Sequence, residues 1–140
     1  MVLAMSNAHA DLIDYADPIN GSENLAKTTM NPVRSALKSG AVALLAGDAK
    51  LANHEFNLAI ARDLKNPALH AANALAYQIR TRAGERDLFD LAETGYLVAL
   101  EQQHDYQQAA VQLAHLYLEN KRYAQAQRAA AYALKLESKN

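Results

Sequence analysis

Histidines, serines and one acidic cluster are the side chains of this 140-residue chain that could transfer protons, attack a carbonyl or bind a metal. The four histidines beyond the N-terminal region show no H-E-x-x-H spacing or other metal-ligand spacing: His54, His70, His104 and His115. No serine lies in a G-x-S-x-G context, and there is no cysteine to act as a thiolate. We therefore predict no catalytic residue and no metal site. A site assembled from histidines of different segments is the alternative that the spacing leaves open.

The acidic cluster lies in "GERDLFDLAE", residues 84–93. It holds only one glycine and lacks the ligand spacing of an EF-hand loop. Its carboxylates suit a solvated turn that leads into a helix N-terminus. No G-x-G-x-x-G or Walker A loop is present, so we expect no cofactor and no enzyme activity.

Composition points instead to one helical domain. Thirty of the 140 residues are alanine, the residue with the best intrinsic helix propensity. The formal net charge is −1, which gives no bulk electrostatic case for binding nucleic acid. No apolar run approaches the roughly 20 residues that span a bilayer, so we expect no integral membrane segment.

The first thirty residues differ in pattern from the rest. Met1–Met5 is apolar, and Ala8-His9-Ala10 has the form of a signal-peptidase site. We interpret residues 1–30 as a flexible leader that carries a signal-peptide remnant, and residues 31–140 as the repeat domain. This predicts export, to the periplasm in a bacterium. A cytoplasmic protein with an irregular N-terminus is the alternative. Because proline suits the first turn of a helix, the first helix is expected to begin at Pro32.

Alanines recur in pairs seven residues apart, and the residue after each second alanine is a large aliphatic. The pairs are Ala52/Ala59, Ala92/Ala99 and Ala126/Ala133. Upstream of each pair lies a stripe at helical spacing that we expect to pack inward: Ala36, Gly40 and Ala43; Ala72, Leu75, Ala76 and Ile79; Ala110, Leu113, Ala114 and Tyr117. Phe56 and Tyr96 should fill the space between neighbouring units, and "TRAGERDL", residues 81–88, should be an extended turn.

On these residues the chain resembles the tetratricopeptide-repeat (TPR) family. The last unit, 107–140, matches best, with Leu113, Ala114, Tyr117, Tyr123, Ala126, Ala133 and Leu136 at signature positions. The resemblance implies an all-α solenoid of three antiparallel helix pairs, because one pair cannot bury its apolar face alone. The signature tryptophan is replaced by Ala110, and the late proline by Ser138.

The resemblance also implies that the first helix of each pair lines a concave groove that holds a peptide or a partner helix. By this register, the predicted partner-binding residues are Arg34, Leu37, Lys38, Leu44, Asn73, Tyr77, Arg80, Gln112, His115 and Leu118. Arg34, Lys38 and Arg80 would favour an acidic or C-terminal segment. Lys38 and Asn73 only partly match the cation–asparagine set with which family members hold a terminal carboxylate. A mixed solvated face is the alternative interpretation of these positions.

We therefore expect a non-catalytic protein–protein interaction scaffold or adaptor. The alternative is an oligomeric structural subunit of a larger assembly. The end of the array bears on this choice, because terminal repeats need a polar outer face. Ala130 stands in the last unit where Phe56 and Tyr96 stand in the others, while Tyr132, Leu134 and Leu136 add apolar surface. The C-terminal helix is thus expected to mediate weak self-association or to dock a partner.

Overall fold

A computed structural model describes the backbone of residues 21–139 and the side chains of residues 32–139. The sequence features Met1–Met5 and Ala8-His9-Ala10 lie outside the described residues. Within residues 21–139 the chain is all α-helical, apart from turns and one short 3-10 helix. The helices are α2 (Gly21–Leu45), α3 (Ala49–Arg62), α4 (Pro67–Arg82), η1 (Arg86–Leu88), α5 (Phe89–Gln102), α6 (Gln107–Glu119) and α7 (Tyr123–Ser138).

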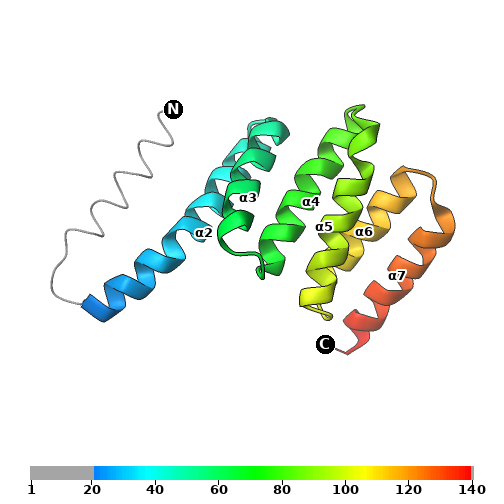
Figure 1. The fold of residues 1–140 in the computed structure, drawn as a ribbon. Helices are drawn as coiled ribbons and strands as arrows, with labels where there is room; N and C mark the ends of the chain where they lie inside the picture. The colour runs from blue at the N-terminus through cyan, green and yellow to red at the C-terminus, as the bar shows by residue number, and fades with distance from the viewer. Residues whose placement is uncertain (1–20, 140) are drawn as a thin grey trace.

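The helices form a row of three antiparallel pairs, α2/α3, α4/α5 and α6/α7 (Figure 1). The backbone of α4 lies close to that of α2 on one side and to that of α6 on the other. The backbones of α3, α5 and α7 do not approach one another in this way. The row therefore curves with the first helix of each pair on its concave side. This is the arrangement expected from the three alanine pairs.

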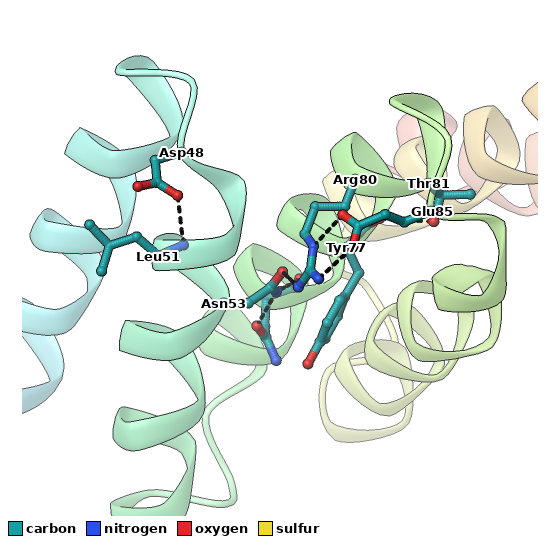
Figure 2. A network of polar contacts seen from close by, with 8 residues as sticks. Asp48, Leu51, Asn53, Tyr77, Arg80, Thr81 and Glu85 are labelled. Carbon is teal, nitrogen blue, oxygen red and sulfur yellow. Dashed lines mark hydrogen bonds and ion pairs between the residues drawn. The ribbon is translucent and has the colours of Figure 1, made fainter.

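Short turns with specific caps separate the helices. Gly47 has a φ of +81°, and Asp48 then accepts a 3.0 Å hydrogen bond from the Leu51 amide at the start of α3 (Figure 2). Asn66 caps α4 in the same way, with Pro67 at its first position. Between α4 and α5 the chain makes the expected longer turn, in which Gly84 has a φ of +119° and η1 follows.

Alanines and glycines set how closely the helices approach. All six alanines of the three pairs are buried, as predicted. A Cβ atom on Gly95 of α5 would lie 2.8 Å from the Cβ of Ala74 and 3.1 Å from the His70 carbonyl oxygen of α4. A Cβ atom on Gly40 would lie 2.2 Å from the Phe56 ring. Close helix contact therefore depends on the absence of side-chain atoms at these two glycines.

Two aromatic side chains fill the spaces between successive pairs, as predicted. Phe56 is 1% exposed in a cluster with Leu69 and Ala76 of α4. Tyr96 is 1% exposed in a cluster with Leu113 and Leu116 of α6. The first and second helix pairs thus each bury an apolar face against the first helix of the following pair.

The expected start of the first helix at Pro32 is wrong. Helix α2 begins at Gly21 and continues through Pro32 to Leu45. Proline removes one backbone donor and disfavours a helix interior, but it does not end this helix. The boundary that we placed between residues 30 and 31 therefore falls inside a continuous helix.

Candidate functional site

The concave surface contains a groove of about 490 Å³ between α4 and α6. We call it the α4–α6 groove. Helix α4 lines it with Ala68, Ala71, Ala72 and Leu75, and α6 with Gln107, Gln108, Ala109, Val111 and Gln112. Tyr96 and Tyr106 complete the lining. Small side chains on α4 leave the space open, and glutamine amides border it from α6.

This lining shows that our expected register of α4 is wrong. Ala72 and Leu75, which we expected to pack inward, line the groove. Asn73, which we expected on the groove surface, is only 8% exposed. Its neighbour Ala74 is fully buried and lies against Gly95 of α5. The physical reason is that the face of α4 opposite the groove is bound to α3 by hydrogen bonds and packs closely on α5. These contacts fix the rotation of α4 about its axis.

A polar network joins α3 to that face of α4 (Figure 2). Asn53 Nδ2 donates hydrogen bonds to the Asn73 side-chain oxygen at 2.7 Å and to the Asn73 carbonyl oxygen at 3.1 Å. Asn73 Nδ2 donates in turn to Asn57 Oδ1 at 2.9 Å. Asn57 Nδ2 donates to the Tyr77 hydroxyl at 3.1 Å. Asn73 and Tyr77 therefore bind α3 and do not face the α4–α6 groove.

Arg80 closes this network at the end of α4. Its Nη1 donates to Asn53 Oδ1 at 3.1 Å, and its Nε and Nη2 donate to the two Glu85 carboxylate oxygens at 2.8 Å each (Figure 2). The hydrogen bonds from Arg80 lower the pKa of Glu85, and the Glu85 carboxylate raises that of Arg80. The Arg80 guanidinium is thus bound to other side chains of the same chain. Of the three cations that we expected to contact an acidic partner segment, only Arg34 and Lys38 remain.

The other predicted site residues divide among different surfaces. Arg34 and Lys38 are exposed on α2, whereas Leu37 and Leu44 are partly buried against the cluster around Phe56. Gln112 lies in the α4–α6 groove. His115 and Leu118 line a separate groove between α6 and α7. The structure therefore does not bring the ten predicted residues together, and the binding roles of those on the surface stay predictions.

A second polar chain ties α4 to α6. The Tyr96 hydroxyl donates to Gln78 Oε1 at 2.6 Å, and Gln78 Nε2 donates to Glu119 Oε1 at 3.3 Å. Arg82 Nη2 donates to the same Glu119 oxygen at 2.7 Å. Because Tyr96 is buried, the pKa of its phenol lies well above the ordinary range. These contacts hold the C-terminal ends of α4 and α6 at a fixed separation.

The sequence reasoning did not identify Ala68 or Gln107 as groove residues. One signal pointed to the correct register: Asn53 and Asn73 each directly follow an alanine in neighbouring alanine-rich helices, and buried asparagines require partners. Such a pair predicts that the two asparagine faces meet. A rotation of α4 that brings Asn73 against Asn53 would have placed Ala72 and Leu75 on the groove side of the helix.

Among residues 32–139, whose side chains the structure describes, no group of three or more histidine, aspartate or glutamate side chains is placed to hold a metal ion. No helix of residues 21–139 has both the length and the apolar character needed to cross a membrane. The α4–α6 groove and the groove between α6 and α7 are the candidate binding surfaces.

Comparison with known proteins supports the fold assignment. The structure is similar to a solved structure described as the second TPR of Spaghetti (RPAP3) bound to HSP90 peptide SRMEEVD, with a TM-score of 0.66 and 20% sequence identity. The match covers 79% of this chain and 98% of that chain. No family model matches the sequence, and no curated protein matches it. The expected all-α, TPR-like solenoid is confirmed at the level of the fold.

Proposed function

We propose that this protein is a non-catalytic interaction module that binds an extended segment of another protein in the α4–α6 groove. The observation that carries this proposal is the lining of the groove. Its residues include no charged side chain, α4 contributes alanines, and α6 contributes glutamines. The similar structure described above was solved with a peptide bound, which supports peptide binding by this fold.

The chemistry of the lining favours an uncharged segment. Glutamine side chains both donate and accept hydrogen bonds, so Gln107, Gln108 and Gln112 can pair with the backbone of an extended chain. The space above Ala68 and Ala72 suits apolar side chains of the ligand. A terminal carboxylate would find no cation in the groove lining. Arg80 lies outside that lining and is paired with Glu85.

The exposed cations of α2 define a second part of the proposed surface. Arg34 and Lys38 are four residues apart and exposed, so they lie on one face of the helix. We propose that they contact an acidic stretch that flanks the uncharged segment. Such exposed charges raise the association rate more than the affinity.

A displayed peptide library, selected on the full chain and followed by calorimetry, tests this function. We expect Ala68→Arg to weaken the selected peptides by about tenfold or more, since a long side chain would occupy the groove. Leu58→Glu is the matched control, because Leu58 is 54% exposed on α3 and lies outside the α4–α6 groove. Equal affinity of the wild-type chain and a folded Ala68→Arg variant would refute binding in this groove.

A charge reversal tests the contribution of α2. The combined change Arg34→Glu and Lys38→Glu should slow association with a peptide that carries an acidic flank and leave a neutral peptide unaffected. Raising the salt concentration should reduce the difference, because screening weakens exposed charge pairs. An unchanged association rate for the acidic peptide would remove α2 from the proposed surface.

A further inference from the structure

The turns within the second and third helix pairs enclose a polar hollow of about 300 Å³, which we call the turn hollow. These turns join α4 to α5 and α6 to α7, and they lie at the same edge of the array (Figure 1). Every residue that lines the hollow is polar, charged or glycine. The turn hollow therefore suits a polar ligand, unlike the two grooves described above.

Positive charge predominates in the turn hollow. Its lining includes the cations Arg82, Arg86 and Lys121 and the single carboxylate Glu119. Asp87, next to Arg86 in sequence, does not line it. Within the part of the chain whose side chains are described, Arg86 and Lys121 make no ion pair. Three cations against one carboxylate leave two positive charges uncompensated, in a chain whose formal net charge is −1.

Glu119 positions Arg82 without using all of its donors. Glu119 Oε1 accepts hydrogen bonds from Arg82 Nη2 at 2.7 Å and from the buried Gln78 Nε2 at 3.3 Å. A guanidinium has five N–H donors in a fixed geometry, and the Arg82 side chain is 55% exposed. Donors on Arg82 are therefore still available to an incoming anion. Because Glu119 already orients the guanidinium, less conformational freedom is lost on binding.

The α6–α7 turn differs in charge from the equivalent turn of the first pair. Gly47-Asp48 directly precedes α3, whereas Lys121-Arg122 directly precedes α7. Gly47 and Lys121 share a left-handed backbone, with φ values of +81° and +61°. This conformation suits glycine and is unfavourable for a residue with a Cβ atom. The turn itself thus does not require lysine, which brings a charge to the hollow at a conformational cost that glycine would avoid.

The helix dipole does not explain the whole cluster. Cations interact favourably with the C-terminal end of a helix, and Arg82 is the last residue of α4. Arg86 lies beyond the end of α4, in η1, so that interaction does not account for its place beside Arg82 and Lys121.

A phosphate monoester fits the charge and the size of the turn hollow. It carries about −1.5 to −2 charge at pH 7, which balances the uncompensated cations, and guanidinium groups donate paired hydrogen bonds to phosphate oxygens. A water molecule in the liquid occupies about 30 Å³, so the hollow has room for a phosphoryl group and some of the atoms that carry it. A single carboxylate would leave one positive charge unmatched.

We propose that the turn hollow binds the phosphoryl group of a phosphate monoester through Arg82, Arg86 and Lys121. The site shares no lining residue with the α4–α6 groove, and it does not depend on the proposed function. Two carriers have this chemistry, a small phosphorylated molecule and a phosphorylated side chain. The experiment below separates them.

Titration of the ¹⁵N-labelled full-length chain with sodium phosphate, followed by NMR, tests the site. We expect saturable shifts of the amide signals of Gly84, Arg86 and Lys121. Sodium chloride at the same ionic strength should not produce them, because screening by salt does not saturate at one site.

Removal of single cations tests the assigned residues. Arg86→Gln and Lys121→Gly should each weaken phosphate binding by about tenfold, because each removes a charged hydrogen-bond donor. Lys121→Gly should keep the fold, since glycine suits the left-handed backbone. Arg62→Gln and Lys65→Gln are the matched controls. They remove the same charges from exposed positions around the α3–α4 turn, at the opposite edge of the array (Figure 1), and should leave the affinity unchanged.

A peptide series identifies the carrier. An alanine peptide with one central phosphoserine is compared with glycerol phosphate and with the same peptide carrying glutamate instead. Tighter binding of the phosphoserine peptide than of glycerol phosphate assigns the site to a phosphorylated side chain. An affinity for the peptide at or below that for glycerol phosphate assigns it to a small molecule.

Three outcomes would overturn the proposal. One is the absence of saturable shifts with phosphate, or identical shifts with phosphate and chloride. Another is phosphate binding that the folded Arg86→Gln and Lys121→Gly variants retain in full. The third is equal affinity for the glutamate and phosphoserine peptides, which would assign the turn hollow to carboxylates.

Discussion

Asn53 of α3 donates a 2.7 Å hydrogen bond to the side-chain oxygen of Asn73 in α4, and both residues are buried at the boundary between the first and second helix pairs. The same Asn53 side chain accepts a hydrogen bond from Arg80. One amide thus uses its donor and its acceptor to hold α4 in a single rotational setting.

Replacing Asn53 should cost stability because it leaves buried partners unpaired. We expect Asn53→Leu to lower the free energy of unfolding by about 1–3 kcal/mol, since Asn73 and Arg80 lose the hydrogen bonds that they make with Asn53. Urea unfolding followed by circular dichroism measures this. In the double variant Asn53→Leu/Asn73→Leu, part of the loss should be recovered, because two apolar side chains then face each other. Strict additivity of the two single changes would contradict the pairing.

A methyl group at Gly95 should separate α4 from α5. The added Cβ would meet Ala74 at 2.8 Å and the His70 carbonyl oxygen at 3.1 Å. Although alanine gains up to about 1 kcal/mol of helix propensity over glycine, we expect Gly95→Ala to destabilise the fold, because overpacking typically costs about 1–3 kcal/mol. Thermal unfolding should show a lower midpoint, and Ala74→Gly in the same chain should restore part of it. A higher midpoint for Gly95→Ala would refute this close approach.

The equivalent alanines Ala92 and Ala126 should respond differently to enlargement. Ala92 is fully buried, whereas Ala126 is 8% exposed and also lines the groove between α6 and α7, which we call the end groove. We expect Ala92→Leu to cost about 1–3 kcal/mol, and Ala126→Leu to cost less, because the leucine can extend into the open groove. Parallel urea titrations of the two variants compare them. A larger loss at Ala126 would mean that the end groove is filled in solution.

Alkaline pH should destabilise the protein through Tyr96. Burial, followed by the nearby Glu119 charge, raises the pKa of its phenol above the ordinary value of about 10. The folded state therefore favours the neutral phenol. This contribution is complete below about pH 10 and is lost as the pH rises towards the folded-state pKa. The free energy of unfolding should fall above about pH 10, and Tyr96→Phe should make that fall shallower. If Tyr96→Phe lost stability with pH as steeply as the wild-type chain, Tyr96 would not be the group responsible. Part of the pH dependence should remain in Tyr96→Phe, because burial also raises the pKa of Tyr117.

The alanine pairs allowed the helix pairs to be predicted from the sequence, because small residues seven apart mark one helix face. The rotation of α4 could not be obtained in the same way. Apolar or small residues occur on every face of α4, including Leu69, Ala72, Ala74 and Leu75, so hydrophobic periodicity does not select one orientation. Contacts between distant residues decide it, chiefly those of Asn53 with Asn73.

The start of α2 illustrates a different limit. Pro32 resembles a helix start in sequence, yet the helix begins at Gly21 and passes through the proline. A local breaker signal of a few kcal/mol can be outweighed by the rest of a long helix. The end groove was anticipated only in outline. Tyr132 and Leu134, expected to add apolar surface on the C-terminal helix, are 39% and 65% exposed. Tyr132 also donates a hydrogen bond to the His104 carbonyl oxygen, and Leu136 is buried, contrary to expectation.

The chain of contacts from Tyr96 through Gln78 to Glu119 has a mechanical consequence for the concave surface. The side-chain hydrogen bonds between α4 and α6 in the described chain, made by Gln78 and Arg82, all lie near the C-terminal ends of these two helices. At the opposite ends, Ala68 faces Gln107 and Gln108 across the groove without such a bond. Side-chain hydrogen bonds between α4 and α6 therefore fix the helix spacing at one end of the groove, whereas packing sets it at the other end. We expect the groove to have one end of constant width and one end that adjusts, so that ligands of different bulk bind in the same register.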